Sequence, residues 1–326
     1  MKKLVSILLA LSMLLCAFAA FAEEEAEGYK IAVVPKLTSI AWFERMEVGV
    51  QQYNEANGTD YVYTGSVEGA EQAAHVESLL GAGYDAICVV PFDTEALDPI
   101  LARAREMGIV VITHEAAGLQ NVDYDIEAFD NTAYGEHFMA AIGEATGGTG
   151  EYIQIVGALT SASHMQWIEG AQAYQEANFP DMKQVGTLES ADNQSTSYEK
   201  VKEALTANPN IVAIQGSAMG DVAGAALAVE ELGLAGQVTI IGTSLVSVSG
   251  KYVEDGTIQM IGFWDPALAG QAMIELAIAT LEGTAADGMS LPVEGYNDLK
   301  LVDNVFYANA WIDVDASNVA DEAYNF

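Results

Sequence analysis

Aromatic and hydrogen-bonding side chains gather directly after short apolar segments of this sequence. Lys36, Trp42 and Phe43 follow residues 31–35, and Glu115 follows residues 109–113. Later apolar runs are followed in the same way by Ser163, His164, Met219, Asp221, Ser244, Trp264 and Asp265. Aromatic rings stack on the C–H faces of a sugar or polyol, carboxylates accept hydrogen bonds from its hydroxyls, and Lys, His and Ser donate to its oxygens. The set therefore predicts binding of a small hydroxylated molecule.

The charge types available to such a site favour an uncharged ligand. The sequence contains no arginine after Arg105, so a bidentate clamp for a carboxylate is not available in the second half. Some candidates also have a structural interpretation. Asp221 and Asp265 precede helical segments, where capping alone explains an aspartate, and Trp42 or Phe43 could belong to the core.

The sequence does not match the known motifs of catalysis, cofactor binding or metal binding. Residues 35–43, after the first expected strand, contain no glycine, so the dinucleotide fingerprint is missing. In residues 216–220 the serine stands one place too early for a nucleophile elbow. The four histidines are far apart and not paired with cysteine. The acidic alternations at 123–127 and 313–315 lack the residues of a calcium loop and are interpreted as solvated strand faces. We expect no cofactor and no metal.

Short runs rich in Val and Ile alternate with helical patterns twice along the chain. In the first half we expect strands at 31–35, 61–63, 86–90 and 109–113, and helices at 41–57, 69–80 and 94–107. In the second half we expect strands at 152–156, 185–188, 211–214, 238–241 and 258–262, and helices at 164–178, 197–207, 222–232 and 267–282. Alternation of this kind predicts an α/β fold with two parallel sheets. The candidate residues would then meet at the carboxyl ends of the strands, where open α/β sheets bind ligands.

Composition and charge exclude several classes of protein. The chain has 326 residues, with 12 Lys+Arg against 47 Asp+Glu and a formal net charge of −35. Such a chain repels phosphate backbones, so no nucleic-acid partner is expected. A hydrophobic content of 51% suits a folded protein and not a disordered acidic tail. Two cysteines exclude a disulfide framework, and Cys88, inside an apolar run, is expected to be a core thiol.

The first 22 residues have the pattern of an export signal. Lys2 and Lys3 precede an apolar run that ends in Ala20-Phe21-Ala22, which predicts cleavage after Ala22 and secretion across the inner membrane. The mature protein would act in the periplasm or on the outer face of the membrane. An uncleaved membrane helix is the alternative, since the run is long enough to span a bilayer. A lipid anchor on Cys16 is less favoured, because bulky Leu15 precedes it.

Three motifs give the chain a resemblance to a known family. They are Ile31-Ala32-Val33-Val34-Pro35-Lys36-Leu37, then Gly262-Phe263-Trp264-Asp265-Pro266 with Gly270, and the ending Tyr324-Asn325-Phe326. With the export signal, these motifs resemble the type I periplasmic-binding proteins of sugar ABC transporters, above all the receptors for autoinducer-2 and rhamnose. The resemblance implies two Rossmann-like lobes, joined by a hinge of three crossings, that enclose a ligand. The lobes would comprise residues 28–130 plus 265–290, and residues 131–264 plus 291–326.

The resemblance also implies roles for individual residues. Lys36 matches the family's ligand lysine, Glu115 stands where an aspartate is usual, and Asp265 matches a polar position that closes the site. Ser163 and His164 differ from the residues that autoinducer-2 receptors carry. These departures favour a small sugar or sugar alcohol over autoinducer-2.

Together these features predict a monomeric, extracytoplasmic substrate-binding protein that captures a neutral simple sugar or polyol and delivers it to an ABC permease. An autoinducer-2 receptor, or a sensor whose closed form docks on a signalling receptor, is a related alternative. A third possibility, from another class, is an exported carbohydrate hydrolase that uses Glu115 with Asp221 or Asp265 as its acid and base.

Overall fold

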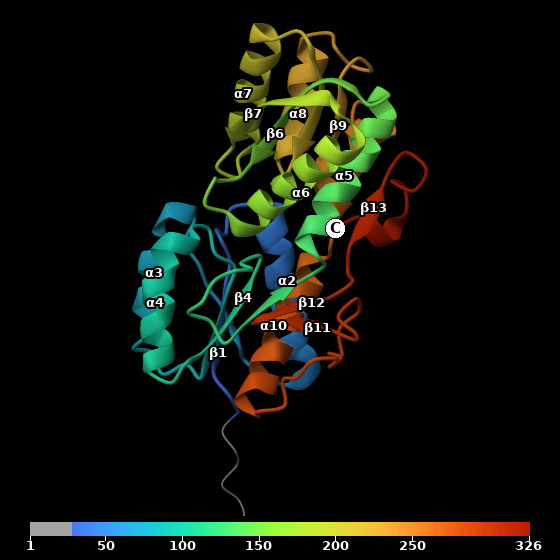
Figure 1. The fold of residues 1–326 in the computed structure, drawn as a ribbon. Coiled ribbons are helices and arrows are strands. Elements are labelled where there is room, and N and C mark those ends of the chain that lie inside the picture. The colour runs from blue at the N-terminus through green and yellow to red at the C-terminus, as the bar shows by residue number, and fades with distance from the viewer. Residues whose placement is uncertain (1–27) are drawn as a thin grey trace, which may run out of the picture.

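The computed structural model describes residues 28–326, which form two α/β lobes stacked end to end (Figure 1). The expected signal segment, residues 1–22, and Cys16 within it lie outside the described residues. Within residues 28–326, no helix has both the length and the apolar composition needed to cross a membrane.

The first lobe is built on a seven-stranded sheet with the strand order β11-β12-β5-β4-β3-β1-β2, parallel except at β11. Its strands are β1 (Ile31–Val34), β2 (Val62–Tyr63), β3 (Ala86–Val89), β4 (Val110–His114), β5 (Tyr124–Glu127), β11 (Lys300–Val302) and β12 (Val305–Tyr307). Its helices are α2 (Ala41–Asn57), the short 3-10 turn η1 (Gly69–Glu71), α3 (Gln72–Leu79), α4 (Thr94–Glu106) and α10 (Pro266–Leu281).

Alternate residues of β1 explain why this sheet is covered on both faces. Val33 belongs to a cluster with Met46 of α2, whereas Ala32 and Val34 pack in a second cluster with Leu101 of α4. Side chains of a strand alternate between faces, so an uninterrupted apolar strand needs a helical layer on each side. Figure 1 shows α3 and α4 on one side of the sheet and α2 and α10 on the other.

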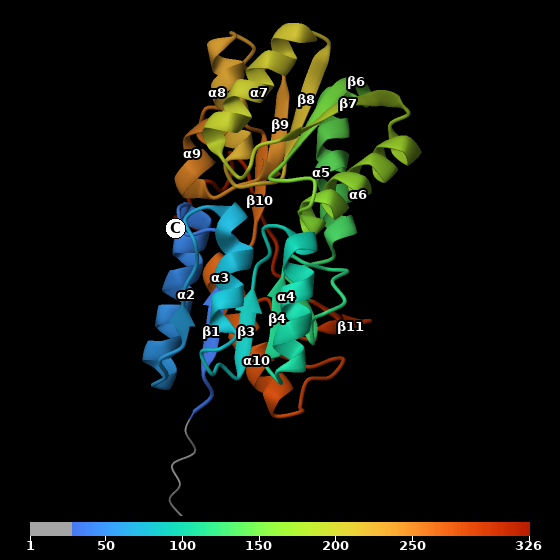
Figure 2. The ribbon, with the colours of Figure 1, turned by 90° about the vertical axis from the view of Figure 1, so that its left-hand side faces the viewer.

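The second lobe has a six-stranded sheet with the order β13-β10-β9-β8-β6-β7, parallel except at β13. Its strands are β6 (Thr149–Val156), β7 (Asp181–Glu189), β8 (Ile211–Gly216), β9 (Thr239–Thr243), β10 (Met260–Phe263) and β13 (Ile312–Val314). Its helices are α5 (Asn131–Thr146), α6 (Ala162–Asn178), α7 (Gln194–Ala207), α8 (Asp221–Glu231) and α9 (Val246–Glu254), with the 3-10 turn η2 (Glu322–Tyr324) near the C-terminus. Figure 2 shows α5 and α6 on one side of this sheet and α7, α8 and α9 on the other.

Three segments connect the lobes. The chain passes from β5 to α5, returns from β10 to α10, and passes again from β12 to β13. This confirms the predicted arrangement of two parallel-sheet lobes joined by three crossings. The strands expected from the sequence are all present, with ends that differ by a few residues, and the expected helix at 69–80 begins with the turn η1.

The C-terminal stretch corrects the predicted lobe boundaries. Residues 291–326 were assigned as a whole to the second lobe, but β12 pairs in parallel with β5 and β11 pairs with β12, so residues 300–307 extend the first sheet. Only β13, which pairs with β10, adds to the second sheet. The edge of the first sheet beside β5 is completed by strands too short to give a periodic signal.

Helix α5 and the acidic alternation before it were not predicted correctly. A Cβ on Gly135 of α5 would lie 1.9 Å from the carbonyl oxygen of Trp167, so close packing on α6 requires glycine where the helical pattern wants a larger residue. The pattern of residues 123–127 suggested a solvated strand face, but Asp125 and Glu127 of β5 are buried. In the second alternation, Asp315 is exposed and Asp313 is half-buried, within 2.8 Å of the His137 ring.

Candidate functional site

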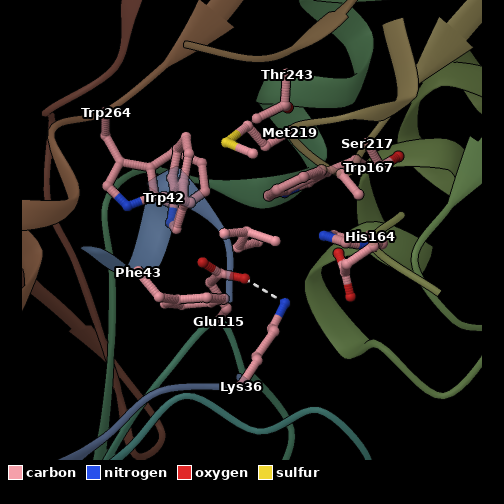
Figure 3. Close-up of a pocket in the computed structure, with 13 residues that line it drawn as sticks. Lys36, Trp42, Phe43, Glu115, His164, Trp167, Ser217, Met219, Thr243 and Trp264 are labelled. Atoms are coloured by element: carbon pink, nitrogen blue, oxygen red, sulfur yellow. Dashed lines mark hydrogen bonds and ion pairs between the residues drawn. The ribbon is translucent and has the colours of Figure 1, made fainter. Parts of the chain in front are cut away.

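A cavity with an empty volume of about 300 Å³, partly open to solvent, lies between the carboxyl ends of the two sheets (Figure 3). The first lobe and the crossing after β10 contribute Lys36, Ile40, Trp42, Phe43, Glu115 and Trp264, and the second lobe contributes His164, Trp167, Asp192, Ser217, Ala218, Met219 and Thr243. This volume includes space that is open to solvent, so it is an upper bound on the enclosed space. The lining, with a few polar groups among aromatic rings, is typical of a small-molecule site.

Hydrogen bonds between the lobes hold them together beside this cavity. The Ser163 hydroxyl donates to the backbone oxygen of Glu115 at 3.3 Å, and the Thr94 hydroxyl donates to that of Thr160 at 3.2 Å. The Gln166 amide donates to the backbone oxygen of Ala117 at 3.4 Å. The predicted site residue Ser163 thus joins the two lobes instead of lining the cavity.

Lys36 and Glu115 form a buried ion pair in the cavity wall. The Lys36 Nζ donates to Glu115 Oε2 at 2.5 Å, and both side chains are at most 4% exposed. Burial alone would lower the pKa of Lys36, but Glu115 and Asp192 outweigh it and raise that pKa, so Lys36 stays charged. Glu115 has φ of +59°, a left-handed conformation unusual for a residue with a side chain. A strained backbone that points a carboxylate into a cavity is typical of a functional position.

His164 presents a single N–H group to its surroundings. Its Nδ1 accepts a hydrogen bond from the backbone N–H of Gly157 at 3.1 Å, so a neutral ring carries its proton on Nε2. Burial, and secondarily the charge of Lys36, lowers the pKa of His164 well below its usual value. Near neutral pH the residue is therefore an uncharged donor.

Tryptophan side chains form the apolar wall and are oriented by bonds behind it. Trp264 Nε1 donates to His114 Nε2 at 3.0 Å, and Trp167 Nε1 donates to Asn131 Oδ1 at 2.6 Å. Because an indole N–H can only donate, His114 Nε2 must accept, which places the His114 proton on Nδ1, facing the carbonyl oxygen of Ile126 at 2.5 Å. The rings of Trp42 and Trp264 meet edge to face, with centroids 4.6 Å apart.

Seven of the eleven predicted site residues line the cavity: Lys36, Trp42, Phe43, Glu115, His164, Met219 and Trp264. The other four, which include Ser163 described above, lie behind it. The Ser244 hydroxyl donates to the backbone oxygen of Met219 at 2.7 Å and so positions that loop. Asp265 caps α10 and pairs with Arg45 at 2.6 Å, so the carboxylate expected to close the site is committed elsewhere.

Asp221 holds the loop after β8, which lines the cavity, by hydrogen bonds to its backbone. Its Oδ2 accepts from the backbone N–H groups of Ser217 and Ala218 at 3.1 and 2.7 Å. Burial raises the pKa of Asp221 to about 7, against the lowering effect of hydrogen bonds from Ser190 and Ala218. The carboxyl is therefore a structural group that titrates near neutral pH.

The raised pKa of Asp221 predicts a pH-dependent stability. Above pH 4 the unfolded chain releases this proton, but the folded protein keeps it up to about pH 7. The free energy of unfolding should therefore fall by up to about 4 kcal/mol as the pH rises from 4 to 7. Asp221→Asn keeps an acceptor for the two N–H groups and should remove much of this fall. Urea unfolding of the ligand-free protein at pH 5 and pH 8 measures it, with the exposed Asp60→Asn as control. An unchanged difference between the two pH values would refute the assignment.

Six cavity residues were not among the predicted set: Ile40, Trp167, Asp192, Ser217, Ala218 and Thr243. Trp167, Ser217 and Thr243 follow expected strands and so carried the same positional signal. Asp192 belongs to the loop after β7, which has no aromatic neighbour and carries φ of +54° at this residue. Burial raises the pKa of Asp192, although Lys36 opposes the shift. Only the fold brings this loop to the cavity.

The arrangement provides binding groups but not the acid and base pair expected for a hydrolase. Neither Asp221 nor Asp265, the predicted partners of Glu115, lines the cavity, and Glu115 is itself held by Lys36. Within residues 28–326, no group of three or more His, Cys, Asp or Glu side chains is placed to hold a metal ion. The site can enclose a small molecule and offer it charged and neutral hydrogen-bonding groups opposite aromatic rings.

Two α/β lobes that close over a cavity through three crossings define a ligand-enclosing binding protein with the type I periplasmic-binding fold. The chain belongs to the family described as "Periplasmic binding protein domain", whose model matches residues 31–285.

The chain is also similar to individual sugar- and polyol-binding proteins. The chain is 28% identical over 214 residues to a xylitol-binding protein of Mycolicibacterium smegmatis, covering 64% of this chain and 58% of that one. It is 26% identical over 286 residues to the D-allose-binding periplasmic protein of Escherichia coli, covering 84% of this chain and 90% of that one. An ABC transporter solute-binding protein from Clostridium phytofermentas, solved with L-rhamnose bound, superposes with a TM-score of 0.84 at 23% identity, over 92% of this chain and all of the other.

Proposed function

We propose that this protein is the extracytoplasmic substrate-binding component of an ABC transporter and captures one neutral monosaccharide or polyol between its lobes. The observation that carries the proposal is the cavity between the lobes, in which the ion pair Lys36–Glu115 of the first lobe lies with His164 of the second and with tryptophan side chains. Relatives that are named for binding xylitol and D-allose support the ligand class.

The ionisable groups of the cavity favour a neutral ligand over an anion. Lys36 is neutralised by Glu115, Asp192 adds a carboxyl group, and His164 is uncharged. An anion would have to be buried next to two carboxyl groups without an arginine to pair with it. A sugar, in contrast, accepts hydrogen bonds from Lys36 and His164 and donates them to Glu115.

Binding would favour the closed arrangement because only there do both lobes contact the ligand. The closed surface is what a permease would recognise, and the protein would release the sugar unaltered, acting without a cofactor and as a monomer. The export signal predicted at residues 1–22 would place the protein in the periplasm or at the outer face of the membrane.

Calorimetric titration tests the proposal. The purified protein is titrated with pentoses, hexoses, deoxyhexoses, tetritols and autoinducer-2, and with aspartate as a charged control. We expect at least one uncharged ligand to bind at one site per chain with a Kd well below about 1 mM, which is about −4 kcal/mol, and aspartate not to bind. If no sugar, polyol or autoinducer-2 binds more tightly than this, the proposed function is wrong.

A further inference from the structure

Two acidic residues of β5, Asp125 and Glu127, are buried behind the loop that carries Glu115 to the cavity. They are 1% and 2% exposed, and as alternate residues of one strand they point to the same face of the sheet. β5 is the last strand before the first crossing between the lobes. Two carboxyl groups buried side by side are costly unless they are neutralised or hydrogen-bonded, so their protonation and their partners decide what they do.

The hydrogen bonds of the pair fit one shared proton. The Thr113 hydroxyl donates to Asp125 Oδ1 at 2.7 Å, and the backbone N–H of Ala117 donates to Glu127 Oε1 at 3.2 Å. Asp125 Oδ2 is also buried, and within residues 28–326 no donor other than a protonated Glu127 is placed to bond it. Burial, and secondarily the charge of Asp125, raises the pKa of Glu127 well above its usual value. A proton on Glu127 therefore supplies the donor that Asp125 lacks and avoids two adjacent buried charges.

The other ionisable groups near the pair offer no free cation to neutralise a second charge. They are Lys36 after β1, His114 of β4 and Glu115 after it, Tyr296 between α10 and β11, and Tyr307 of β12. Lys36 is the one permanent cation among these groups, and it is bonded to Glu115. The His114 ring is neutral, since its Nε2 accepts the N–H of Trp264. Near neutral pH the pair therefore carries one proton and one negative charge.

The loop that Glu127 supports is also the part of the first lobe to which the second lobe bonds. The Glu115 side chain enters the cavity from this loop (Figure 3). The backbone oxygens of Glu115 and Ala117 accept from Ser163 and Gln166 of the second lobe at 3.3 and 3.4 Å. The left-handed backbone of Glu115 persists only if its surroundings fix it. The bond from the Ala117 N–H to Glu127 anchors this loop on the strand behind it.

We propose that Glu127 is a positioning residue for ligand binding, which in its protonated form bridges Asp125 and the Ala117 N–H and thereby holds Glu115 in the cavity. Glu127 does not line the cavity, so it acts through the loop and not on the ligand. The bridge needs one atom that accepts and one that donates, which a neutral carboxyl group provides and a carboxylate does not. This inference rests on the proposed function, because ligand affinity is what the loop controls.

Two substitutions of Glu127 separate its shape from its charge. Glu127→Gln keeps the length of the side chain, an oxygen for Ala117 and an N–H for Asp125, so affinity for the tightest-binding sugar should stay within about threefold of wild type. Glu127→Asp keeps the acid but is one methylene shorter, so it cannot bridge both partners and should weaken binding about tenfold or more. Calorimetry measures the affinities, and urea unfolding shows whether each variant is folded. Glu106→Gln, at the exposed end of α4, is the control and should bind as wild type does.

A residue that acted by its charge would give the opposite pattern. If Glu127→Gln binds about tenfold more weakly than wild type, or if Glu127→Asp binds as tightly, the positioning role is overturned and the proposed function stands. If the wild type binds no sugar or polyol, both fail. Should Glu127→Asp not fold, Glu127→Gln and the infrared spectrum decide. At pH 7 the wild-type spectrum minus that of Glu127→Gln should contain the C=O band of a protonated carboxyl group, and its absence would overturn the shared proton.

Discussion

Replacing Lys36 with methionine is expected to lower ligand affinity about 100-fold or more and to reduce the free energy of unfolding by about 3–5 kcal/mol. The substitution removes a hydrogen-bond donor from the wall of the cavity. It also leaves Glu115 as a buried carboxylate, 4% exposed, without its partner at 2.5 Å. Calorimetry measures the loss of affinity, and urea unfolding measures the loss of stability.

A second substitution separates these two effects. In the double variant Lys36→Met/Glu115→Gln no unpaired charge is buried, so much of the stability should return, while affinity should stay low because the ligand still lacks both groups. Arg103→Ala is the matched control, since Arg103 pairs with Glu77 at 2.7 Å at the exposed surface. Its effect on stability should be below about 1 kcal/mol. If Lys36→Met binds the ligand with wild-type affinity, the ion pair does not take part in ligand binding.

Replacing Trp264 with alanine is expected to cost about 3–5 kcal/mol of stability and at least about 30-fold in affinity. Trp264 lies in the crossing between β10 and α10, is 2% exposed, and packs edge to face on Trp42 and on Phe129. Phe129 follows β5 and also contacts Trp311, which precedes β13. Residues from all three crossings, Phe129, Trp264 and Trp311, therefore meet at one aromatic cluster, and of these three Trp264 lines the cavity.

The controls for Trp264 distinguish ligand contact from packing at the hinge. Trp311→Ala removes an indole from the third crossing that does not line the cavity, so it should lower stability but change affinity little. Trp264→Phe keeps a ring but leaves His114 Nε2 without its donor, which should cost about 1–3 kcal/mol. Equal losses of affinity in Trp264→Ala and Trp311→Ala would mean that Trp264 acts only through the hinge.

The sequence predicted the repeating α/β elements because buried parallel strands are short apolar runs with strong periodic neighbours. It did not predict α5, where Gly135 is dictated by the approach of Trp167 across two helices. The strands β11 and β12 were also missed, since three residues each carry no period. Such features depend on contacts between distant parts of the chain, which local patterns do not encode.

The site was predicted where the position of a residue after a strand determined its place. Lys36, Glu115 and His164 lie at the cavity for that reason. Asp221 and Asp265 have the same position, but backbone N–H groups of the loop before α8 bind Asp221, and the start of α10 and the Arg45 guanidinium bind Asp265. Whether a carboxylate at a helix start faces a ligand or the protein depends on the partners that folding supplies, and these are not visible in the sequence.

A crystal structure of the protein with its tightest-binding sugar tests the central claim most directly. It should show one sugar in the cavity between the lobes, with oxygens within hydrogen-bonding distance of Lys36 and Glu115 from one lobe and His164 from the other, and with its apolar edge against Trp264. A sugar bound at the outside of either lobe, or a cavity filled by the protein's own side chains while the sugar sits elsewhere, would contradict the account.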